Sequence, residues 1–352
     1  MDFKKELKRN KIDSILITYP QNVFYLTGYR GFLSEEKDAK VLITKKINYL
    51  FTDKRYLGEL NKLKGFQTED ISLFLKTVNE NKIKSAGFEE TSVNIPEYKS
   101  LKKIFKRLKP LSGVIENYRS VKEAGETAKI KKACGIGDRA FKYILGKIKE
   151  GVTEEDIEMQ LETFIRGQKA NISFRPIVAF GKNSAVPHHQ NGKTKLKRGM
   201  IVLLDFGVNY KGYCSDMTRT VFFGPKNEKF EQIYKTVLEA QNSAIQFINH
   251  KSSIRNQKII ASGVDKAARQ YITGKGFGLI PHSTGHGIGI QVHEKPSLSP
   301  KSKDILKSGM IFSIEPGIYL ENFGGVRIED LFCLSGKGLK KLTHSPSGIF
   351  YL

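Results

Sequence analysis

Residues 201–216 read IVLLDFGVNYKGYCSD, and this stretch decides the fold of the second part of the chain. An apolar run leads into Asp205, where a carboxylate would be costly to bury without a partner. Asp216 follows after a glycine-containing turn at 209–212, which is typical of a hairpin. Two strands joined in this way would bring both carboxylates to one site. On these residues alone, an aspartate that only caps a helix or turn at a strand end remains an alternative for Asp205.

The sequence around this hairpin is also rich in strand-like segments. Beyond Ile172, short apolar runs recur, and helix-like segments interrupt them at 228–249 and 256–273. Thr153, followed three residues later by Asp156, predicts the start of another helix. We therefore expect residues 124–352 to form a curved antiparallel sheet covered by helices.

The first part of the chain has a different pattern. From Asp13 to about Leu111, short apolar runs alternate with segments rich in Lys, Leu and Glu, which is typical of an α/β domain. The pattern changes at 114–126. The sequence therefore predicts two domains, residues 1–120 and residues 124–352, and an α+β chain as a whole.

Composition and charge exclude several classes of protein. The 352 residues include 59 Lys and Arg against 36 Asp and Glu, a net charge of +23. Since this excess is spread along the chain, without a patch or a reading motif, we expect no nucleic-acid partner. No apolar segment is long enough to span a membrane, and the first twenty residues lack signal-peptide features. Three cysteines without a CxxC pair are typical of reduced thiols in a cytosolic protein. Together, these features predict a cytoplasmic protein without a membrane partner.

Histidines cluster in the segment HSTGHGIGIQVH at 282–293, which holds three of the seven in the chain. The glycines at 285, 287 and 289 disfavour a helix and predict a loop or strand whose backbone passes close to a neighbour. No HExxH zinc motif is present at this position. Clustered histidines are typical of metal and catalytic sites, although each one could instead be a hydrogen-bonded core residue.

Two glutamates lie in further strand-like segments, Glu315 in SIEPGIY and Glu329 in GVRIED. Arg327 has the i,i+2 spacing that places it on the same strand face as Glu329, so a structural salt bridge is one interpretation. Two aspartates, two glutamates and a histidine on apolar strands are harder to explain as separate ion pairs. Buried like charges repel unless cations hold them. Such a ligand set suits two divalent ions such as Mn²⁺, Co²⁺ or Zn²⁺ and indicates a two-metal hydrolytic centre.

Together these motifs resemble those of the pita-bread metallopeptidases, the group of aminopeptidase P, prolidase and methionine aminopeptidase. The resemblance runs through NSAVPHH, LLDFGVNYKGYCSDMTRT, HSTGHGIGIQVHEKP, SIEPGIY and GVRIED. SILITYPQNVFYLTGYRG is similar to the start of the creatinase-type domain in this group. The resemblance implies a pita-bread catalytic domain of curved antiparallel sheet and covering helices, preceded by an α/β creatinase-type domain.

The resemblance also implies roles for individual residues. The metal ligands would be Asp205, Asp216, His286, Glu315 and Glu329. Asp216 and Glu329 would bridge two ions, of which Mn²⁺ is the first expectation and Co²⁺ or Zn²⁺ the alternatives. A water or hydroxide between the ions would be the nucleophile, and Glu315 its proton acceptor.

Other positions would face the substrate. The resemblance assigns His293 a hydrogen bond to the oxyanion and places His188 near the scissile bond. His282 would lie on the substrate side, and Arg327 would steady the ligands beside the substrate. Tyr213 and Tyr319 are weaker candidates for such contacts. His189, which follows His188, is assigned no role.

The expected activity is that of a metal-dependent exopeptidase acting on peptides with proline at the second position. The first expectation is an Xaa-Pro aminopeptidase, and the alternative is a prolidase that accepts only Xaa-Pro dipeptides. A catalytically inactive relative that binds peptides is the alternative of a different class. The resemblance further implies a homodimer.

Overall fold

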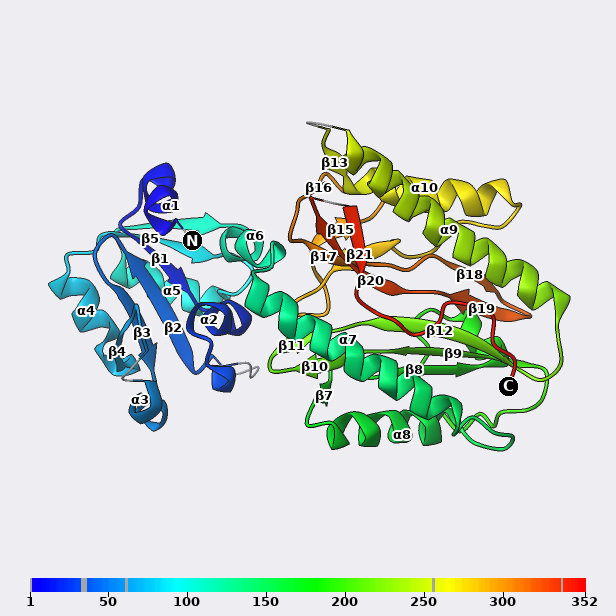
Figure 1. The fold of residues 1–352 in the computed structure, drawn as a ribbon. Coiled ribbons are helices and arrows are strands. Elements are labelled where there is room, and N and C mark those ends of the chain that lie inside the picture. Colours follow the sequence, from blue (N-terminus) through cyan, green and yellow to red (C-terminus); the bar gives the residue numbers. More distant parts are fainter. Residues whose placement is uncertain (1, 33–36, 61–62, 255–256, 337) are drawn as a thin grey trace. The chain divides into compact units, whose positions relative to one another are not determined.

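The computed structural model describes all residues except 1, 33–36, 61–62, 255–256 and 337. The chain forms two compact units, Met1–Arg119 and Ser120–Leu352 (Figure 1). No helix among the described residues combines the length and apolar character needed to cross a membrane.

The unit Met1–Arg119 is built on a mixed six-stranded sheet in the order β4-β3-β2-β1-β5-β6. The strands are β1 (Ser14–Ile17), β2 (Ala39–Thr44), β3 (Asn48–Thr52), β4 (Gln67–Asp70), β5 (Ser85–Glu89) and β6 (Arg107–Leu111). The helices are α1 (Phe3–Asn10), α2 (Pro20–Thr27), α3 (Lys54–Leu60), α4 (Phe74–Glu80), α5 (Ile95–Ile104) and α6 (Val114–Ser120). β1 pairs antiparallel with β2 and parallel with β5.

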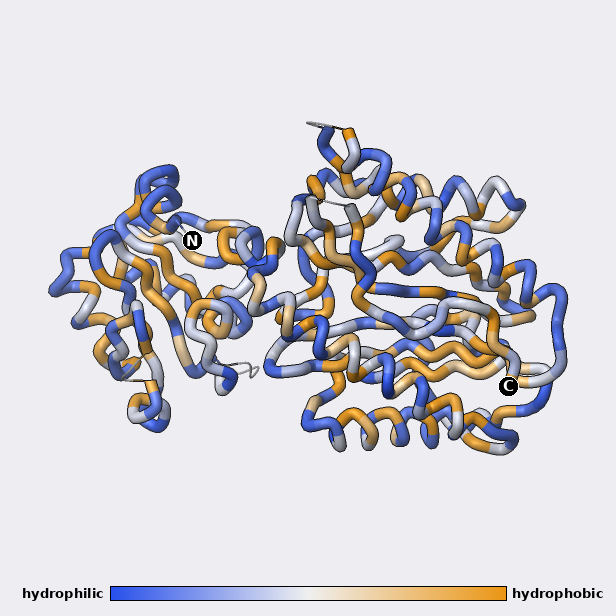
Figure 2. Tube along the Cα trace, viewed as in Figure 1, coloured by the Kyte–Doolittle hydropathy of each residue, from blue (hydrophilic) through white to orange (hydrophobic). Residues whose placement is uncertain are grey.

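The central strands β1, β2 and β3 are buried on both faces, which explains why they are nearly continuous apolar runs. Ile15 and Ile17 belong to one hydrophobic cluster with helix residues such as Leu7, whereas Leu16 between them belongs to a second cluster with Phe74. Successive strand residues point to opposite faces. The tube in Figure 2 accordingly shows long apolar stretches on the central strands of the unit. This arrangement confirms the predicted α/β character of the first part of the chain.

Among its described residues, the unit Ser120–Leu352 combines antiparallel sheets with four α-helices. The helices are α7 (Ala124–Leu145), α8 (Glu154–Gly167), α9 (Glu228–Ser253) and α10 (Ala261–Gly274). The three-stranded sheet is β12 (Met217–Phe223), β9 (Met200–Phe206) and β8 (Ile177–Phe180), and the five-stranded sheet is β15 (Glu294–Leu298), β14 (Gly285–Gly287), β17 (Ile311–Ile314), β20 (Asp330–Ser335) and β21 (Gly338–Lys341). A further small sheet has three strands, β7 (Asn171–Ile172), β10 (Val208–Tyr210) and β11 (Tyr213–Cys214). Two more sheets have two strands each, β13 (Ile259–Ile260) with β16 (Ile305–Leu306) and β18 (Gly317–Leu320) with β19 (Gly324–Arg327).

Two hydrophobic cores pack the helices of this unit against its strands. One joins α7 and α8 to β8, β9 and β12, and the other joins α9 and α10 to β17 and β20 (Figure 1). Val202 and Leu204 of β9 belong to the first core, while Ile201 belongs to the second. Asp205 has the strand parity of Ile201, so its side chain points away from α7 and α8. Helices covering antiparallel sheets confirm the predicted α+β fold class.

The local signals in the quoted segment appear in the structure as a tight hairpin. β10 pairs with β11 through Tyr210 opposite Tyr213. The two turn residues, Lys211 and Gly212, have φ values of 52° and 85°. Positive φ at both central positions is the geometry that suits the twist of a two-residue hairpin. At α8, Thr153 accepts from the backbone N–H of Asp156, which confirms the predicted helix start.

Candidate metal centre

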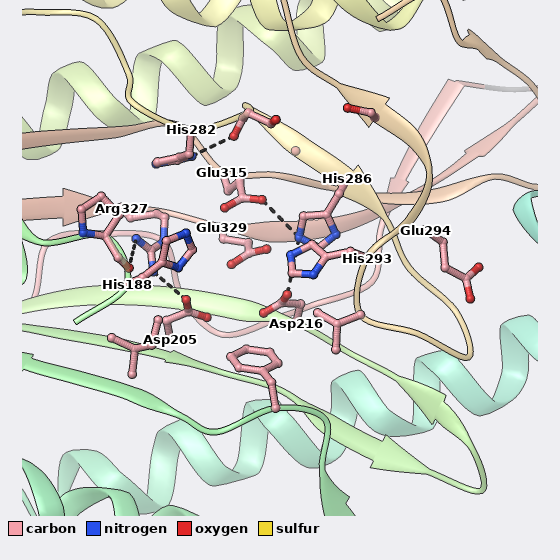
Figure 3. A pocket seen from close by; sticks show the side chains of 17 residues that line it. His188, Asp205, Asp216, His282, His286, His293, Glu294, Glu315, Arg327 and Glu329 are labelled. Carbon is pink, nitrogen blue, oxygen red and sulfur yellow. Dashed lines mark hydrogen bonds and ion pairs between the residues drawn. The ribbon is translucent and has the colours of Figure 1, made fainter. Parts of the chain in front are cut away.

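A cavity of about 490 Å³ lies within the unit Ser120–Leu352 (Figure 3). Its lining includes the predicted site residues His188, Asp205, Asp216, His282, His286, His293, Glu315, Arg327 and Glu329. Apolar side chains of Phe174, Ile177, Pro187 and Val292 line it as well. The structure therefore brings nine sequence-predicted residues, which are up to 141 positions apart in the chain, to one cavity.

Strand pairing brings the carboxylates together. Asp205 lies near the end of β9, and Asp216 immediately precedes β12, which pairs with β9 through Thr218 opposite Asp205. Glu315 follows β17, and Glu329 precedes β20, which pairs with β17 through Ile314 opposite Asp330. Each carboxylate thus stands at or beside the end of a strand, where four strand ends approach the same cavity (Figure 3).

Glycines allow the strand that carries His286 to fit between its neighbours. β14 pairs with both β15 and β17. A Cβ atom on Gly285 would lie 2.1 Å from the carbonyl oxygen of Ser313, and one on Gly287 would lie 2.1 Å from that of Lys295. Neither position tolerates a side chain, which confirms the predicted close passage of the backbone.

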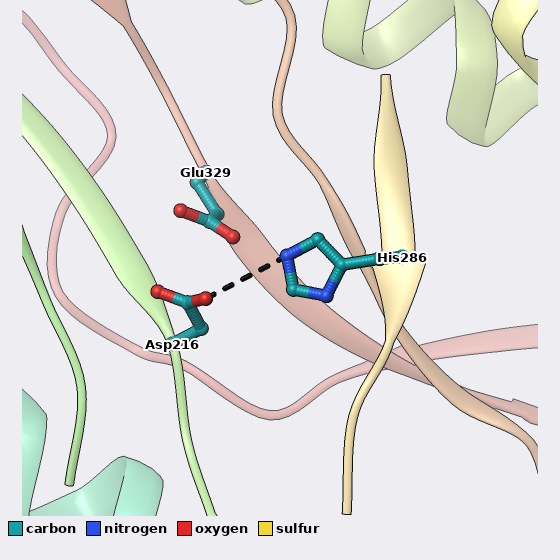
Figure 4. Close-up of side chains that lie close together, drawn as sticks. All are labelled: Asp216, His286 and Glu329. Carbon is teal, nitrogen blue, oxygen red and sulfur yellow. Dashed lines mark ion pairs between the residues drawn. The ribbon is translucent and has the colours of Figure 1, made fainter. Parts of the chain in front are cut away.

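His286 lies at the centre of the acidic group. Its Nε2 atom is 3.2 Å from Glu315 Oε1 and 3.6 Å from Asp216 Oδ2. Asp216, His286 and Glu329 each offer one atom that could bind a metal ion, and these three atoms all lie within 4.8 Å of one another (Figure 4). His286 Nδ1 is 3.1 Å from the carbonyl oxygen of Gly287, which can only accept. Nδ1 must therefore carry a proton, which it donates to this carbonyl, and Nε2 faces the carboxylates.

Burial and like charge perturb the acidic side chains strongly. Burial, followed by the negative charges of neighbouring carboxylates, raises the pKa of Asp216 and of Glu329 well above the ordinary value. Burial also disfavours the charged form of Glu315, but the hydrogen bond and the charge of His286 outweigh it and lower the pKa of Glu315 to about 2. Burial likewise opposes charging of His286, yet Glu315 raises the pKa of that imidazole to about 9.

Three buried carboxylate oxygens have no hydrogen-bond donor among the residues that the structure describes. They are Asp205 Oδ1, Asp216 Oδ1 and Glu329 Oε1. Such groups are costly unless something satisfies them. Oxygen atoms of carboxylates together with one imidazole nitrogen are a donor set that divalent transition ions accept. The residues of this cavity therefore fit a site for divalent cations.

Arg327 bonds to Asp205 and not to Glu329. Its Nη2 donates to Asp205 Oδ2 at 2.6 Å, its Nη1 to the Tyr319 hydroxyl at 2.8 Å and its Nε to Thr218 Oγ1 at 3.1 Å. Glu329 Oε2 instead accepts from Thr218 Oγ1 at 2.8 Å. The interpretation of Arg327 and Glu329 as a salt bridge is therefore wrong. Arg327 orients Asp205 and has most of its donors occupied.

His282 is held inside the protein by both ring nitrogens. Nδ1 is 2.8 Å from the carbonyl oxygen of Ser283, and Nε2 is 2.7 Å from the Tyr319 hydroxyl. Because the carbonyl only accepts, Nδ1 is the donor and Nε2 receives the proton of Tyr319. Burial raises the pKa of Tyr319 to about 12, so its hydroxyl keeps that proton at neutral pH. Only the ring edge and face of His282 remain for a ligand.

His188 and His293 differ from His282 because both are exposed and neither imidazole bonds to another described residue. The ring of His293 lies 4.3 Å from that of His286, centroid to centroid. Burial and then the positive charge of His286 lower the pKa of His293. Both imidazoles line the cavity and remain available to a ligand.

Tyr213 is not among the residues that line the cavity. Its ring is buried, its hydroxyl donates to Glu126 Oε1 at 3.1 Å, and the Lys129 ammonium lies 4.6 Å from the ring centroid. The side chain thus fastens the hairpin to α7. This placement gives no support to the predicted substrate contact of Tyr213.

Comparison with known proteins gives the family. Residues 128–335 match the model of metallopeptidase family M24, and residues 2–121 match the Creatinase/Prolidase N-terminal domain. An Xaa-Pro dipeptidase from Bacillus anthracis superposes with a TM-score of 0.92 at 36% identity, over 99% of this chain and 98% of that one.

Two further solved structures are similar over nearly their whole length. The prolidase from Pyrococcus horikoshii OT3 gives a TM-score of 0.88 at 33% identity, over 97% of this chain and 96% of that one. The X-Pro aminopeptidase from Thermotoga maritima MSB8 gives 0.87 at 32% identity, over 97% and 98%. Since the M24 model covers more than half of the chain and includes every residue described in the cavity, this protein belongs to metallopeptidase family M24.

Proposed function

We propose that this metallopeptidase is a prolidase, which hydrolyses the peptide bond of Xaa-Pro dipeptides with the help of two divalent cations. The observation that carries the proposal is the convergence of four carboxylates and His286 on one cavity, with three buried carboxylate oxygens that lack a donor. The similarity to the B. anthracis Xaa-Pro dipeptidase and the P. horikoshii prolidase supports the dipeptide preference.

In this proposal Asp205, Asp216, His286, Glu315 and Glu329 hold the cations. When bound, the cations act as Lewis acids that lower the pKa of a water molecule and polarise the substrate carbonyl. Arg327 keeps the Asp205 carboxylate turned toward the cavity, and Thr218 does the same for Glu329. We propose Mn²⁺ as the ion to restore first, with Co²⁺ and Zn²⁺ as alternatives, because the mixed oxygen and nitrogen donors accept all three.

The exposed imidazoles complete the proposed chemistry. His293 and His188 line the cavity with free ring nitrogens and would donate hydrogen bonds to the carbonyl oxygen as it becomes negative. Glu315 is the proposed acceptor of the proton of the attacking water and returns it to the leaving amine. The apolar side chains of Phe174, Ile177 and Val292 offer a surface that suits a proline ring.

An Xaa-Pro aminopeptidase remains the second candidate function, supported by the similarity to the T. maritima X-Pro aminopeptidase. The two activities differ in whether the substrate continues beyond proline. A homodimer and a cytoplasmic location, both implied by the sequence, stay predictions.

The distinguishing experiment measures release of the first residue from Ala-Pro and from Ala-Pro-Ala by metal-stripped protein to which Mn²⁺ is restored. Ala-Ala serves as the control peptide, and the Asp216→Asn variant as the control protein. We expect kcat/KM for Ala-Pro to exceed that for Ala-Pro-Ala by at least about tenfold, which corresponds to about 1.4 kcal/mol. Preferred cleavage of the tripeptide would assign the aminopeptidase activity. Cleavage of neither proline peptide would contradict both.

A further inference from the structure

We propose that Glu154 and His189 form a clamp that positions His188 over the metal centre, an inference that rests on the proposed peptidase function. The sequence pattern assigns no role to His189. In the structure its Nε2 atom lies 2.9 Å from Glu154 Oε2. Glu154 is the first residue of α8, and no part of its side chain is exposed.

Glu154 fastens both ends of the segment that carries His188. Its Oε1 accepts from the backbone N–H of Phe180 at 2.9 Å and from Asn183 Nδ2 at 2.8 Å. Its Oε2 accepts from the backbone N–H of Gly192 at 3.0 Å as well as from His189. One buried carboxylate therefore ties residue 180, at the end of β8, to residue 192, at the far end of the segment. Charge-assisted bonds of this kind are stronger than neutral ones.

The segment between these ties has little regular structure of its own. A short 3₁₀ helix covers Gly181–Ala185, and no helix or strand is assigned from 186 to 199. A second buried contact, from Gly325 N to Ser184 Oγ at 2.8 Å, fixes the start of the segment, and Asn191 bonds to Glu158 near its end. Between them, His189 follows His188 directly in the sequence, and its side chain bonds to the buried Glu154.

His188 itself makes no side-chain hydrogen bond to a described residue, although it lines the cavity. Its placement must therefore come from the backbone on either side. His189 is anchored on the α8 side, while Pro187 and His188 line the cavity. Because a misplacement of about 1 Å can cost about a hundredfold in rate, loosening His189 should impair the reaction through His188.

The carboxylate also fixes the proton on His189. A carboxylate oxygen accepts, so His189 Nε2 must carry the hydrogen in this contact. A glutamine at position 189 presents an N–H donor at a similar reach, whereas an alanine presents none. This difference gives a conservative variant that should rescue the function if the bond to Glu154 is what matters.

The test compares His189→Ala, His189→Gln, His188→Ala and the double variant of both positions to Ala. The matched control is His250→Ala, because His250 is exposed on α9. For Ala-Pro hydrolysis we expect His189→Ala to lower kcat at least about tenfold with a smaller change in KM. His189→Gln should stay within about threefold of the wild type. In the His188→Ala background, adding His189→Ala should change kcat less than about twofold, because a positioning residue has no effect once its target is absent.

A second readout does not depend on activity. Amide hydrogen exchange of residues 180–192 in the metal-free protein should be at least about tenfold faster in His189→Ala than in the wild type, with β9 unchanged. Unchanged exchange in His189→Ala, or losses that multiply in the double variant, would overturn the clamp. If the wild type cleaves no proline peptide, the proposed function fails, and the exchange experiment alone decides whether Glu154 and His189 hold the segment.

Discussion

The substitution Asp216→Asn tests the proposed metal centre because it removes the charge that this aspartate would present to a cation, while preserving the size of the side chain. Asp216 is 4% exposed, lies 3.6 Å from His286 Nε2, and its Oδ1 has no donor among the described residues. Burial and then the charges of Glu329 and Asp205 raise its pKa, which favours the protonated carboxyl in the metal-free protein. A neutral amide should therefore cost the metal-free fold little, whereas the metal-loaded protein would lose one of its proposed ligands.

The size of the effect follows from linkage between folding and binding. Free Mn²⁺ at about 100 times its dissociation constant stabilises a folded protein by about 2.7 kcal/mol. For a unit of the size of Ser120–Leu352, each kcal/mol shifts the unfolding midpoint by about 2–4 °C. Mn²⁺ should therefore raise the Tm of the wild-type unit by about 5–11 °C. In Asp216→Asn we expect a rise below about 2 °C and a metal-free Tm close to that of the wild type.

Differential scanning calorimetry of metal-stripped protein, with and without Mn²⁺, measures both quantities. Asp138→Asn is the matched control, because Asp138 lies in the same unit, accepts from the backbone of Ser345 and does not line the cavity. It should lower the metal-free Tm and keep the full shift with Mn²⁺. An undiminished shift in Asp216→Asn would refute the assignment of this aspartate as a ligand.

Three further predictions concern protons and the residues around the centre. The pKa of His286 is raised to about 9 in the metal-free protein, so a cation that binds there must displace its proton. Mn²⁺ affinity should therefore rise with pH up to about 9, and binding near pH 7 should release protons, which calorimetry in buffers of different ionisation enthalpy would detect. His293→Ala should lower kcat by about 10²–10³-fold, which is the cost of losing one hydrogen-bond donor to an oxyanion. The unfolding midpoint should stay within about 2 °C because the side chain is exposed, and an effect on KM alone would contradict the proposed hydrogen bond to the oxyanion. Tyr319→Phe removes the hydroxyl between Arg327 and His282. It should destabilise the protein by about 1–3 kcal/mol in urea unfolding, because one donor of Arg327 and the acceptor nitrogen of His282 lose their partner; a neutral result would argue against that chain of hydrogen bonds.

Much of the fold could be predicted because its signals are local. The turn at 209–212, the Thr153 cap and the glycines around His286 each depend on a few neighbouring residues, and each appears in the structure. Acidic residues on apolar strands were also visible without any structure, since an unpaired carboxylate does not belong there. These signals were enough to indicate where the cavity residues lie in the chain.

Partners that are distant in sequence could not be predicted in the same way. Arg327 pairs with Asp205, which is 122 residues away, whereas local spacing suggested Glu329. Glu154 gave no signal either, because a glutamate at the start of a helix is ordinary and its contacts with Phe180 and Gly192 depend on tertiary packing. Tyr213 shared its motif with the ligands, but strand geometry turned it toward α7.

The most direct test of the metal centre is anomalous diffraction from crystals of the protein loaded with Mn²⁺. We expect two anomalous peaks in the cavity of the unit Ser120–Leu352, both among Asp205, Asp216, His286, Glu315 and Glu329, and none in the Asp216→Asn and Glu329→Gln double variant. Fully loaded wild-type crystals without an anomalous peak in this cavity would contradict the proposed metal centre.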